Sequence, residues 1–482
     1  MLVRIASFLS VVAVLFTGLI FAPAVESKVS FDSASGSYSV KPADLSLVCP
    51  GAVFRTGGDS GTKLSQVNRT GKATASITAF GAGSIEISSV AESNVSELEL
   101  DSERIFVSRE LDDATSLTNL NAQEDPVQGA LSLTASTSQL VATDSMRGLA
   151  AASCQLPSND FYIVGGSTAA GREALLVLTN PSPIDATADL GIFTDLGAAT
   201  VAGLAGISVP AGSTTVLSLA SFAPTVPALA VQVQSQGAKL AGWIQQRAVR
   251  GTAAQGVDWI SPNPAATLQA VIPGLVIRGT KVINQVAKSE ENSDAGHAVR
   301  VFAPEGANVT VQIIASEEDV FGAVFTGIVE PGSVQDFPIS ELLDGNYSVF
   351  VTSDKPIYAG VRVARGNSGG TPRLDFAWLS PADELVSDRA ITVPADGETI
   401  LVLANASDQV SLAKVENLRT GEASSVSVPA LGTATVVISG SVVISQGAGI
   451  FATAVVLIEG QISDLDIRDP KNLGSQVKVR FR

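Results

Sequence analysis

Charged and aromatic side chains are scarce in this sequence of 482 residues. Charged residues make up 16% of it, against about 25% in an ordinary globular protein, and aromatic residues make up 5%. The only histidine, His297, is the one imidazole that could act as the base for a serine nucleophile. One histidine and two cysteines cannot complete a Cys/His zinc site without carboxylates. These shortages argue against a catalytic triad and against a zinc centre.

Positive charge is in deficit, and the formal net charge is −17. Such a surface repels nucleic acid and anionic lipid headgroups, so nucleic acid is excluded as a partner. The acidity is typical of a protein that must stay soluble outside the cell.

The longest uncharged run lies at the N-terminus. Arg4 precedes residues 5–25, and about 20 apolar residues suffice to cross a bilayer. The run ends in an A-x-A-like sequence, Ala22-Pro23-Ala24, which signal peptidase prefers. Residues 1–28 therefore fit both a cleaved signal peptide and an uncleaved anchor, and either would export the remainder. We expect a secreted or membrane-anchored protein that faces the cell exterior and meets the membrane only through residues 5–25.

The two cysteines are Cys49 and Cys154. Exported proteins keep most of their cysteines as disulfides, so a disulfide between these two is predicted. It would tie the N-terminal region to the segment that follows. A free thiol pair or a metal site is the less favoured alternative.

Two of the three tryptophans stand in near-copies of one phrase, DWISP and AWLSP. Trp259 and Pro262 in the first have the same offset as Trp378 and Pro381 in the second. A third phrase, IRDP, ends at Pro470 without a tryptophan. Proline cannot donate to a sheet ladder, so each phrase is predicted to end the last strand of a repeat. Each tryptophan is predicted to pack under the turn between domains.

Alternating apolar segments and Gly, Pro, Asn or Asp turns precede each phrase, as in AGWIQQRAVRG and AGVRVARG. This pattern predicts an all-β protein of tandem Ig-like antiparallel β-sandwich domains after an N-terminal hydrophobic helix. One short helical turn is expected at ISELLDG, residues 339–345. The predicted domains are residues 1–28 (signal or anchor), 29–153 (a Ser/Gly-rich, acidic β domain), 154–267, 268–388 and 389–482 (three β-sandwich repeats, the last with a tail). The 29–153 segment could be a diverged sandwich or could pair partly with the first repeat.

The Cys-Pro-Gly at 49–51 and the segment 154–193, which begins CQLPSNDFYIVGGSTAAGREALLVLTNP, carry a resemblance. The chain resembles a family of large secreted actinobacterial proteins that form a domain of unknown function. That family has an N-terminal hydrophobic segment, a Cys-Pro-Gly, a cysteine before an aromatic-rich strand, a Gly-Gly-Ser stretch and a strand that ends in Asn-Pro. The resemblance implies an envelope location and implies no catalytic residues.

Three short motifs resemble catalytic or phosphate-binding sequences. GNSGG (366–370) fits G-x-S-x-G, and GDSG (58–61) is similar to a serine-protease phrase. A nucleophile elbow needs a strand–turn–helix context, and GNSGG lies in a Gly-rich loop between strands. GGSTAAGRE (165–173) has the glycine spacing of a phosphate loop but leads into a strand and lacks its lysine. We interpret all three as turns, and His297 as an ordinary strand-edge residue.

Acidic residues offer oxygen ligands for calcium at Asp464, Asp466 and Asp469. Their spacing fits no EF-hand loop, and the acidic run from Glu92 to Asp125 is typical of a solvated face. No metal site and no cofactor are predicted.

Trp243 is a candidate ligand-facing aromatic for sugars, although a core position is the favoured interpretation because aromatic residues are usually buried. The sequence as a whole predicts a non-enzymatic, exported envelope protein that is structural or adhesive and binds envelope glycan or protein. The alternatives are an accessory scaffold for envelope polysaccharide assembly and, less favoured, a carboxylate-dependent hydrolase.

Overall fold

The computed structural model describes residues 35–39, 46–56, 67–80, 83–91, 95–100, 105–120, 132–317, 320–367, 373–445, 447–468 and 476–480. The ladders between the strands of these residues are antiparallel, and the described helical segments are short. They are α2 (Thr280–Val286) and the 3-10 turns η2 (Leu219–Ser221) and η3 (Glu290–Ala295). The predicted all-β class is therefore confirmed.

The chain separates into two compact units, residues 1–42 with 473–482, and residues 43–472. In the first unit, β1 (Ser35–Ser39) pairs with β36 (Gln476–Arg480), so the two ends of the chain meet. The predicted N-terminal helix and Pro470 lie outside the described residues. No helix within the described ranges combines the length and the apolar character needed to cross a membrane.

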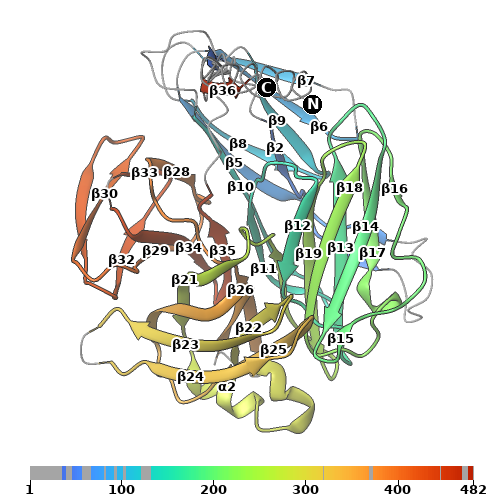
Figure 1. Cartoon of the computed structure of the whole chain (residues 1–482), viewed down its shortest axis with the longest axis vertical. Coiled ribbons are helices and arrows are strands. Elements are labelled where there is room, and N and C mark those ends of the chain that lie inside the picture. The colour runs from blue at the N-terminus through green and yellow to red at the C-terminus, as the bar shows by residue number, and fades with distance from the viewer. Residues whose placement is uncertain are drawn as a thin grey trace, which may run out of the picture. The chain divides into compact units, whose positions relative to one another are not determined.

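In the larger unit, four successive stretches each build two sheets, coloured from blue through green and yellow to red along the chain (Figure 1). In the first stretch one sheet has the order β2 (Ser46–Cys49), β9 (Thr115–Leu120), β6 (Gly83–Ser89), β7 (Val95–Leu100). The other has the order β8 (Ile105–Leu111), β5 (Ala73–Phe80), β10 (Ser132–Ala142), β11 (Arg147–Ser153), and a hairpin joins β3 (Phe54–Thr56) to β4 (Val67–Arg69).

The second stretch forms two sheets on one core. One sheet has the order β12 (Asp160–Val164), β18 (Leu229–Gln236), β14 (Ala186–Thr194), β15 (Gly197–Ala198), with β16 (Ile207–Val209) also on β14. The other has the order β17 (Ser213–Ser218), β13 (Arg172–Asn180), β19 (Ala241–Arg250), β20 (Ala253–Ile260). Strand β14 alternates buried and more exposed side chains, the pattern of a strand with one face on a core, whereas β13 is buried along most of its length.

The third stretch shares one long strand, β26 (Gly345–Asn367), between its two sheets. The first half of β26 pairs with β21 (Thr267–Ile277) and β23 (Ala307–Ala315), and β23 carries the edge strand β24 (Ala323–Val329). The second half pairs with β22 (His297–Ala303), which carries β25 (Ser333–Ile339), and with β27 (Arg373–Leu379).

The fourth stretch repeats the two-sheet arrangement. Its sheets have the orders β28 (Arg389–Thr392), β33 (Ser441–Ser445), β30 (Ser411–Asn417), β31 (Ala423–Val428) and β32 (Thr433–Ile438), β29 (Glu398–Asn405), β34 (Ile450–Ile458), β35 (Gln461–Asp466).

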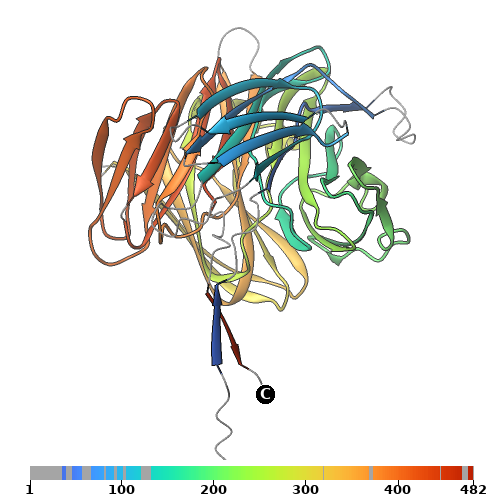
Figure 2. The same cartoon turned by 90° about the horizontal axis from the view of Figure 1, so that it is seen from above.

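In each stretch, one sheet has the last strand of that stretch at its edge. We call this last strand the inner strand, and the four inner strands are β11, β20, β27 and β35. The inner strand β11 lies against β20 and β35, and β27 also lies against β20 and β35. The four stretches are therefore joined through their last strands. Figures 1 and 2 show the four stretches, distinguished by colour, side by side in the larger unit.

The hydrophobic cores cross the boundaries between stretches. Trp378 and Phe376 of the third stretch pack in the core of the second, with Ile260. Leu149 of the first stretch packs in the core of the fourth. The domain boundaries drawn from the sequence stay a prediction, because the larger unit is compact as a whole.

The repeated tryptophan phrases meet at one place. β20 ends at Ile260 and β27 at Leu379, each two residues before the proline of its phrase. Arg468 of the third phrase donates from its two terminal nitrogens to the carbonyl oxygens of Pro262, at 2.8 Å, and Pro381, at 3.1 Å. The three repeat ends are therefore fastened to one another.

Trp243 does not face a ligand. Its side chain in β19 is 0% exposed and meets the Trp259 ring edge-on, with ring centroids 6.5 Å apart. Both rings pack with Phe54 and Met146 of the first stretch. The ligand-facing alternative is wrong because β19 is an interior strand covered by the first stretch, and the favoured core position is correct.

The predicted disulfide between Cys49 and Cys154 is present, with a Cα–Cα distance of 4.4 Å. Beside it, Val48 and Gln155 exchange backbone hydrogen bonds of 2.8 and 2.9 Å. The first stretch thus pairs with the start of the second. Disulfides are typical of oxidising compartments outside the cytoplasm.

The helical turn expected at residues 339–345 is absent. Strand β25 ends at Ile339, and no helix follows it before β26 begins at Gly345. Instead Asp344 accepts hydrogen bonds from the backbone N–H groups of Gly279 (2.9 Å) and Thr280 (2.8 Å). The carboxylate thereby satisfies free donors at the start of α2, a helix that the sequence reasoning missed.

Candidate functional site

The contact between the second and third stretches, here called the seam, combines aromatic rings with buried arginines. At one end Tyr162 of β12 stacks on Tyr358 of β26, with ring centroids 4.2 Å apart and planes at 22°. Phe302 and Phe193 lie beside them, with centroids 4.4 Å apart. Both tyrosines are half-buried. Burial raises the pKa of Tyr162 to about 12, so its hydroxyl stays a neutral donor.

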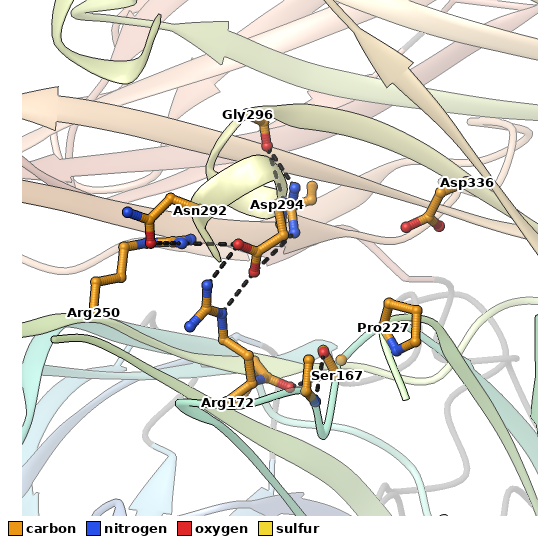
Figure 3. Close-up of polar contacts among 12 residues, drawn as sticks. Ser167, Arg172, Pro227, Arg250, Asn292, Asp294, Gly296 and Asp336 are labelled. Atoms are coloured by element: carbon orange, nitrogen blue, oxygen red, sulfur yellow. Dashed lines mark hydrogen bonds and ion pairs between the residues drawn. The ribbon is translucent and has the colours of Figure 1, made fainter. Parts of the chain in front are cut away.

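At the other end of the seam, three arginines surround Asp294 of η3 (Figure 3). Arg172 grips the carboxylate with two bonds of 2.6 Å, from Nε to Oδ2 and from Nη2 to Oδ1. Arg250 donates from Nη1 to Oδ1 at 2.8 Å and to Asn292 at 2.9 Å. Arg362 approaches more loosely, with Nη1 3.9 Å from Oδ2. The arginines come from β13, β19 and β26, so the cluster ties both stretches together.

A fourth arginine, Arg300 of β22, is 0% exposed. It donates from Nε to Asp336 Oδ1 at 2.7 Å and from Nη2 to Oδ2 at 2.9 Å. Its terminal nitrogens also donate to the carbonyl oxygens of Gly166 and, at 3.0 Å, Pro227. The guanidinium carbon lies 4.5 Å from the centroid of the Trp378 ring, a cation–π distance. Every face of this buried cation is thus occupied.

The seam lowers the pKa values of its acids. Burial acts to raise the pKa of Asp294, but the hydrogen bonds from Arg172 and Arg250 outweigh it and hold this pKa well below the usual range. Arg300 does the same to the pKa of Asp336. Burial also lowers the pKa of Arg362 to about 10, with Arg300 and Arg250 adding repulsion. The seam is therefore a charged network whose arginine side chains are at most 13% exposed and whose aspartate side chains, Asp294 and Asp336, are 31% and 30% exposed.

The inner strands form a second polar cluster, which we call the junction. Asp258 of β20 accepts from the backbone N–H of Trp378 at 2.8 Å and from the Ser463 hydroxyl at 2.8 Å. Asp375 of β27 accepts with Oδ2 from the backbone N–H groups of Leu149 at 3.1 Å and Ile462 at 2.9 Å. Each carboxyl thus satisfies donors on the edges of neighbouring inner strands, which no ladder pairs.

Burial raises the pKa values of the junction acids. It raises that of Asp375 to about 7, although four backbone amides act to lower it. The pKa of Asp258 also lies well above its usual value, because burial outweighs its hydrogen bonds. For Asp464 of β35, burial leads and the neighbouring Asp466 and Asp258 add to the rise. This cluster therefore favours neutral carboxylic acids over carboxylates.

His297, the one candidate base, is bonded to the backbone. The sequence predicts a strand-edge position for His297. The residue instead begins β22, which lies between β25 and β26, and it is buried. Its Nδ1 accepts from the Ala364 N–H at 3.1 Å, and burial lowers its pKa to about 4. Ser368 of GNSGG and the GDSG phrase lie outside the described residues.

The calcium candidates Asp464 and Asp466 are both buried in the junction region, and Asp469 lies outside the described residues. The acidic run is described only in part. Within the described ranges no group of three His, Cys, Asp or Glu side chains is placed to hold a metal ion.

The sequence reasoning missed the seam. Arg172 and Gly166 belong to the segment GGSTAAGRE, which the sequence predicts as a turn, whereas both residues bond across the seam. One signal was present, since the two matched segments AGWIQQRAVRG and AGVRVARG each carry two arginines, and these include Arg250 and Arg362. Asp294 lies in a polar segment, SEENSDAG, and no feature of that segment indicates that its carboxylate pairs with arginines.

Comparison with known proteins gives a family but no activity. The model of a family of unknown function (DUF5719) matches residues 107–439. No curated protein matches the chain. A solved structure of a tetra-tandem repeat in the extending region of a large adhesion protein is 12% identical and covers 82% of this chain and 90% of that one, with a TM-score of 0.11. A likeness at that TM-score supports no conclusion.

Proposed function

We propose a role from the structure itself, because the chain belongs to a family of unknown function (DUF5719) and this membership assigns it no activity. We propose that it is a non-enzymatic, exported envelope protein of tandem Ig-like sandwiches that binds envelope glycan. The disulfide between Cys49 and Cys154 supports an oxidising location. The burial of His297 and its bond to the backbone support the absence of triad chemistry.

The observation that carries the proposal is the half-buried stack of Tyr162 and Tyr358. Aromatic rings present apolar faces against which the C–H groups of a sugar can pack, and tyrosine adds a polar tip. Gln232 lies opposite Tyr162 on the neighbouring strand and donates to Asp160 at 3.1 Å. Two of the four tyrosines in the chain thus meet beside polar side chains, whereas all three tryptophans are buried.

Co-sedimentation tests this role. Purified full-length protein is mixed with isolated actinobacterial cell walls, either native or stripped of protein. We expect retention on stripped walls, and we expect Tyr358→Leu to abolish it, because leucine keeps the apolar contact but removes the planar face. Phe321→Ser is the matched control, since Phe321 is an exposed aromatic (91%) away from the stack. Equal retention of Tyr358→Leu and the wild type would exclude the tyrosine stack as the glycan site.

A second candidate is a scaffold that holds another envelope protein. It is favoured by an apolar strip on edge strand β24, where Val324 is 64% and Ile328 is 68% exposed next to Phe321. Edge strands with exposed apolar side chains are prone to pair with other chains. Retention on native but not on stripped walls, lost in Phe321→Ser, would support this role and reject direct glycan binding.

A further inference from the structure

Strand β24 is the outer strand of its sheet (Figure 1). Among the described residues its one ladder partner is β23, so alternate backbone N–H and C=O groups along its other side have no ladder partner. The side chains of Val324, Thr326 and Ile328 are exposed, whereas Phe325 between them packs against the core. The strand therefore presents an open edge together with an exposed, largely apolar face.

Other edge strands of the larger unit carry features that discourage pairing with a further strand. Strand β25 contains Pro338, which cannot donate to a ladder, and β31 exposes mainly serine. Strand β32 exposes one large apolar side chain, Val437. Strand β24 exposes two, and residues 320–329 contain neither a charged residue nor a proline. Such an edge favours coverage by another strand.

The sequence of β24 is complementary to a second copy of itself. Thr326 is the midpoint of the seven residues Ala323–Val329, so an antiparallel pair centred on it would use the whole strand of both copies. This register would place Thr326 opposite Thr326 and Val324 opposite Ile328, all on the exposed face. Pairs of threonines and pairs of β-branched side chains are favourable across antiparallel strands.

The distribution of charge permits this pairing. The net charge of −17 makes two copies of the chain repel each other over most of their surface. The paired residues are uncharged, and Glu330, the next acid along the chain, would fall opposite Gly322 of the second copy. The exposed neighbours on β23, Asn308 and Gln312, are neutral. No two acidic side chains would therefore stand directly opposite each other.

We infer that the chain forms a twofold dimer in which β24 of one copy pairs antiparallel with β24 of the other. The sheet that contains β24 would then continue across the interface into its copy. Each copy offers one such strand, so the pairing is complete at two copies. The inference does not rest on the proposed glycan binding, because Tyr162 and Tyr358 lie on β12 and β26.

Sedimentation equilibrium of the full-length protein tests the dimer, in about 0.15 M NaCl, where charges more than about 8 Å apart are largely screened. We expect the wild type to show a monomer–dimer equilibrium. Thr326→Lys should raise the dissociation constant at least about tenfold, because a lysine would then face a lysine across the twofold axis. Val437→Lys is the matched control, since it places the same charge at an exposed position of edge strand β32 and should leave the dimer unchanged.

Thr326→Cys tests the register, and it stays informative if the lysine variant fails to fold. The introduced thiol would be free, because Cys49 and Cys154, the two cysteines of the chain, form a disulfide with each other. Opposite Cα atoms of an antiparallel pair lie about 4.5–5.5 Å apart, within reach of a disulfide. We expect Thr326→Cys to form a disulfide-linked dimer in air much faster than Val437→Cys, whose thiol would lie outside the interface.

The inference is overturned if the wild type stays monomeric, if Thr326→Lys leaves the dimer intact, or if Thr326→Cys links no faster than Val437→Cys. Phe321 precedes the paired residues, so Phe321→Ser does not test the register. A monomeric wild type whose retention on native walls is lost in Phe321→Ser would assign this edge to another envelope protein instead.

Discussion

The aspartates of the junction and those of the seam differ in burial and in partners: Asp258 and Asp375 are 0% and 1% exposed, whereas the side chains of Asp294 and Asp336 are 31% and 30% exposed. Asp258 and Asp375 accept from backbone amides and a hydroxyl, whereas Asp294 and Asp336 accept from guanidinium groups. Amide and hydroxyl dipoles do not offset the loss of water, so the pKa of Asp375 rises to about 7. Full positive charges do offset it, so the pKa of Asp294 falls. The charge of the partner and the degree of burial therefore act together to set the direction of the pKa shift.

The two regions should therefore respond to pH in opposite ways. The folded-state pKa of Asp375 exceeds its unfolded value, so its stabilisation is complete below about pH 4 and is lost as pH rises through about 7. The folded-state pKa values of Asp294 and Asp336 lie below the unfolded value, so their stabilisation is complete above about pH 4 and is lost in acid.

The largest effect is expected from breaking the seam at its most buried charge. Asp336→Ala leaves Arg300, which is 0% exposed, without its carboxylate, and should lower the free energy of unfolding by about 3–5 kcal/mol. Urea unfolding at pH 7 measures it. The double variant Arg300→Met with Asp336→Leu should be more stable than Asp336→Ala. A loss below about 1 kcal/mol for the single variant would mean that the pair is not held out of water.

The junction is probed by Asp375→Asn, which keeps the shape and an oxygen acceptor but cannot ionise. The wild type should lose up to about 4 kcal/mol more than this variant between pH 4 and pH 8, because three pKa units of difference correspond to that amount. Denaturant unfolding at the two pH values, at constant ionic strength, gives the comparison. The same pH dependence in both proteins would show that Asp375 does not titrate in this range.

A smaller effect is expected on the loss of stability at low pH that protonation of the seam aspartates causes. Arg172→Gln removes the two bonds of 2.6 Å to Asp294, so the loss of stability between pH 5 and pH 2 should shrink by about 1–2 kcal/mol. Unfolding curves across that range measure it. If the loss of stability between pH 5 and pH 2 were the same in Arg172→Gln and in the wild type, a group other than Asp294 would cause it.

The smallest effect is expected outside both regions. Lys414 and Glu416 form a partly exposed pair at 2.9 Å on β30. Lys414→Gln should change the free energy of unfolding by less than about 0.5 kcal/mol at any pH in the series. A larger change in thermal or urea unfolding would mean that the contrast between seam and junction is not specific to buried acids.

The sequence was informative where neighbours along the chain decide the structure. Strand alternation and the ends of β20 and β27 before Pro262 and Pro381 could be predicted in this way. The disulfide, whose cysteines are 105 residues apart, could be predicted from the presence of two cysteines in a chain expected to be exported. The seam and the junction could not, because they join residues from strands far apart in the chain. Nothing near Asp294 marks Arg172 as its partner. A core position was favoured for Trp243 because aromatic residues are usually buried, but its packing with Phe54 and Met146 of the first stretch could not be foreseen.

The most direct test is the free energy of unfolding of the wild-type protein and of Asp375→Asn from pH 2 to pH 9 at constant ionic strength. The comparison is needed because burial lowers the pKa of His297 to about 4, so His297 alone makes the stability of both proteins rise between about pH 4 and pH 6.5. Both proteins should lose stability in acid as Asp294 and Asp336 gain protons, and the wild type should lose stability relative to Asp375→Asn toward neutral pH as Asp375 loses its proton. A difference between the two proteins that stays constant between pH 4 and pH 8 would contradict the account of the junction.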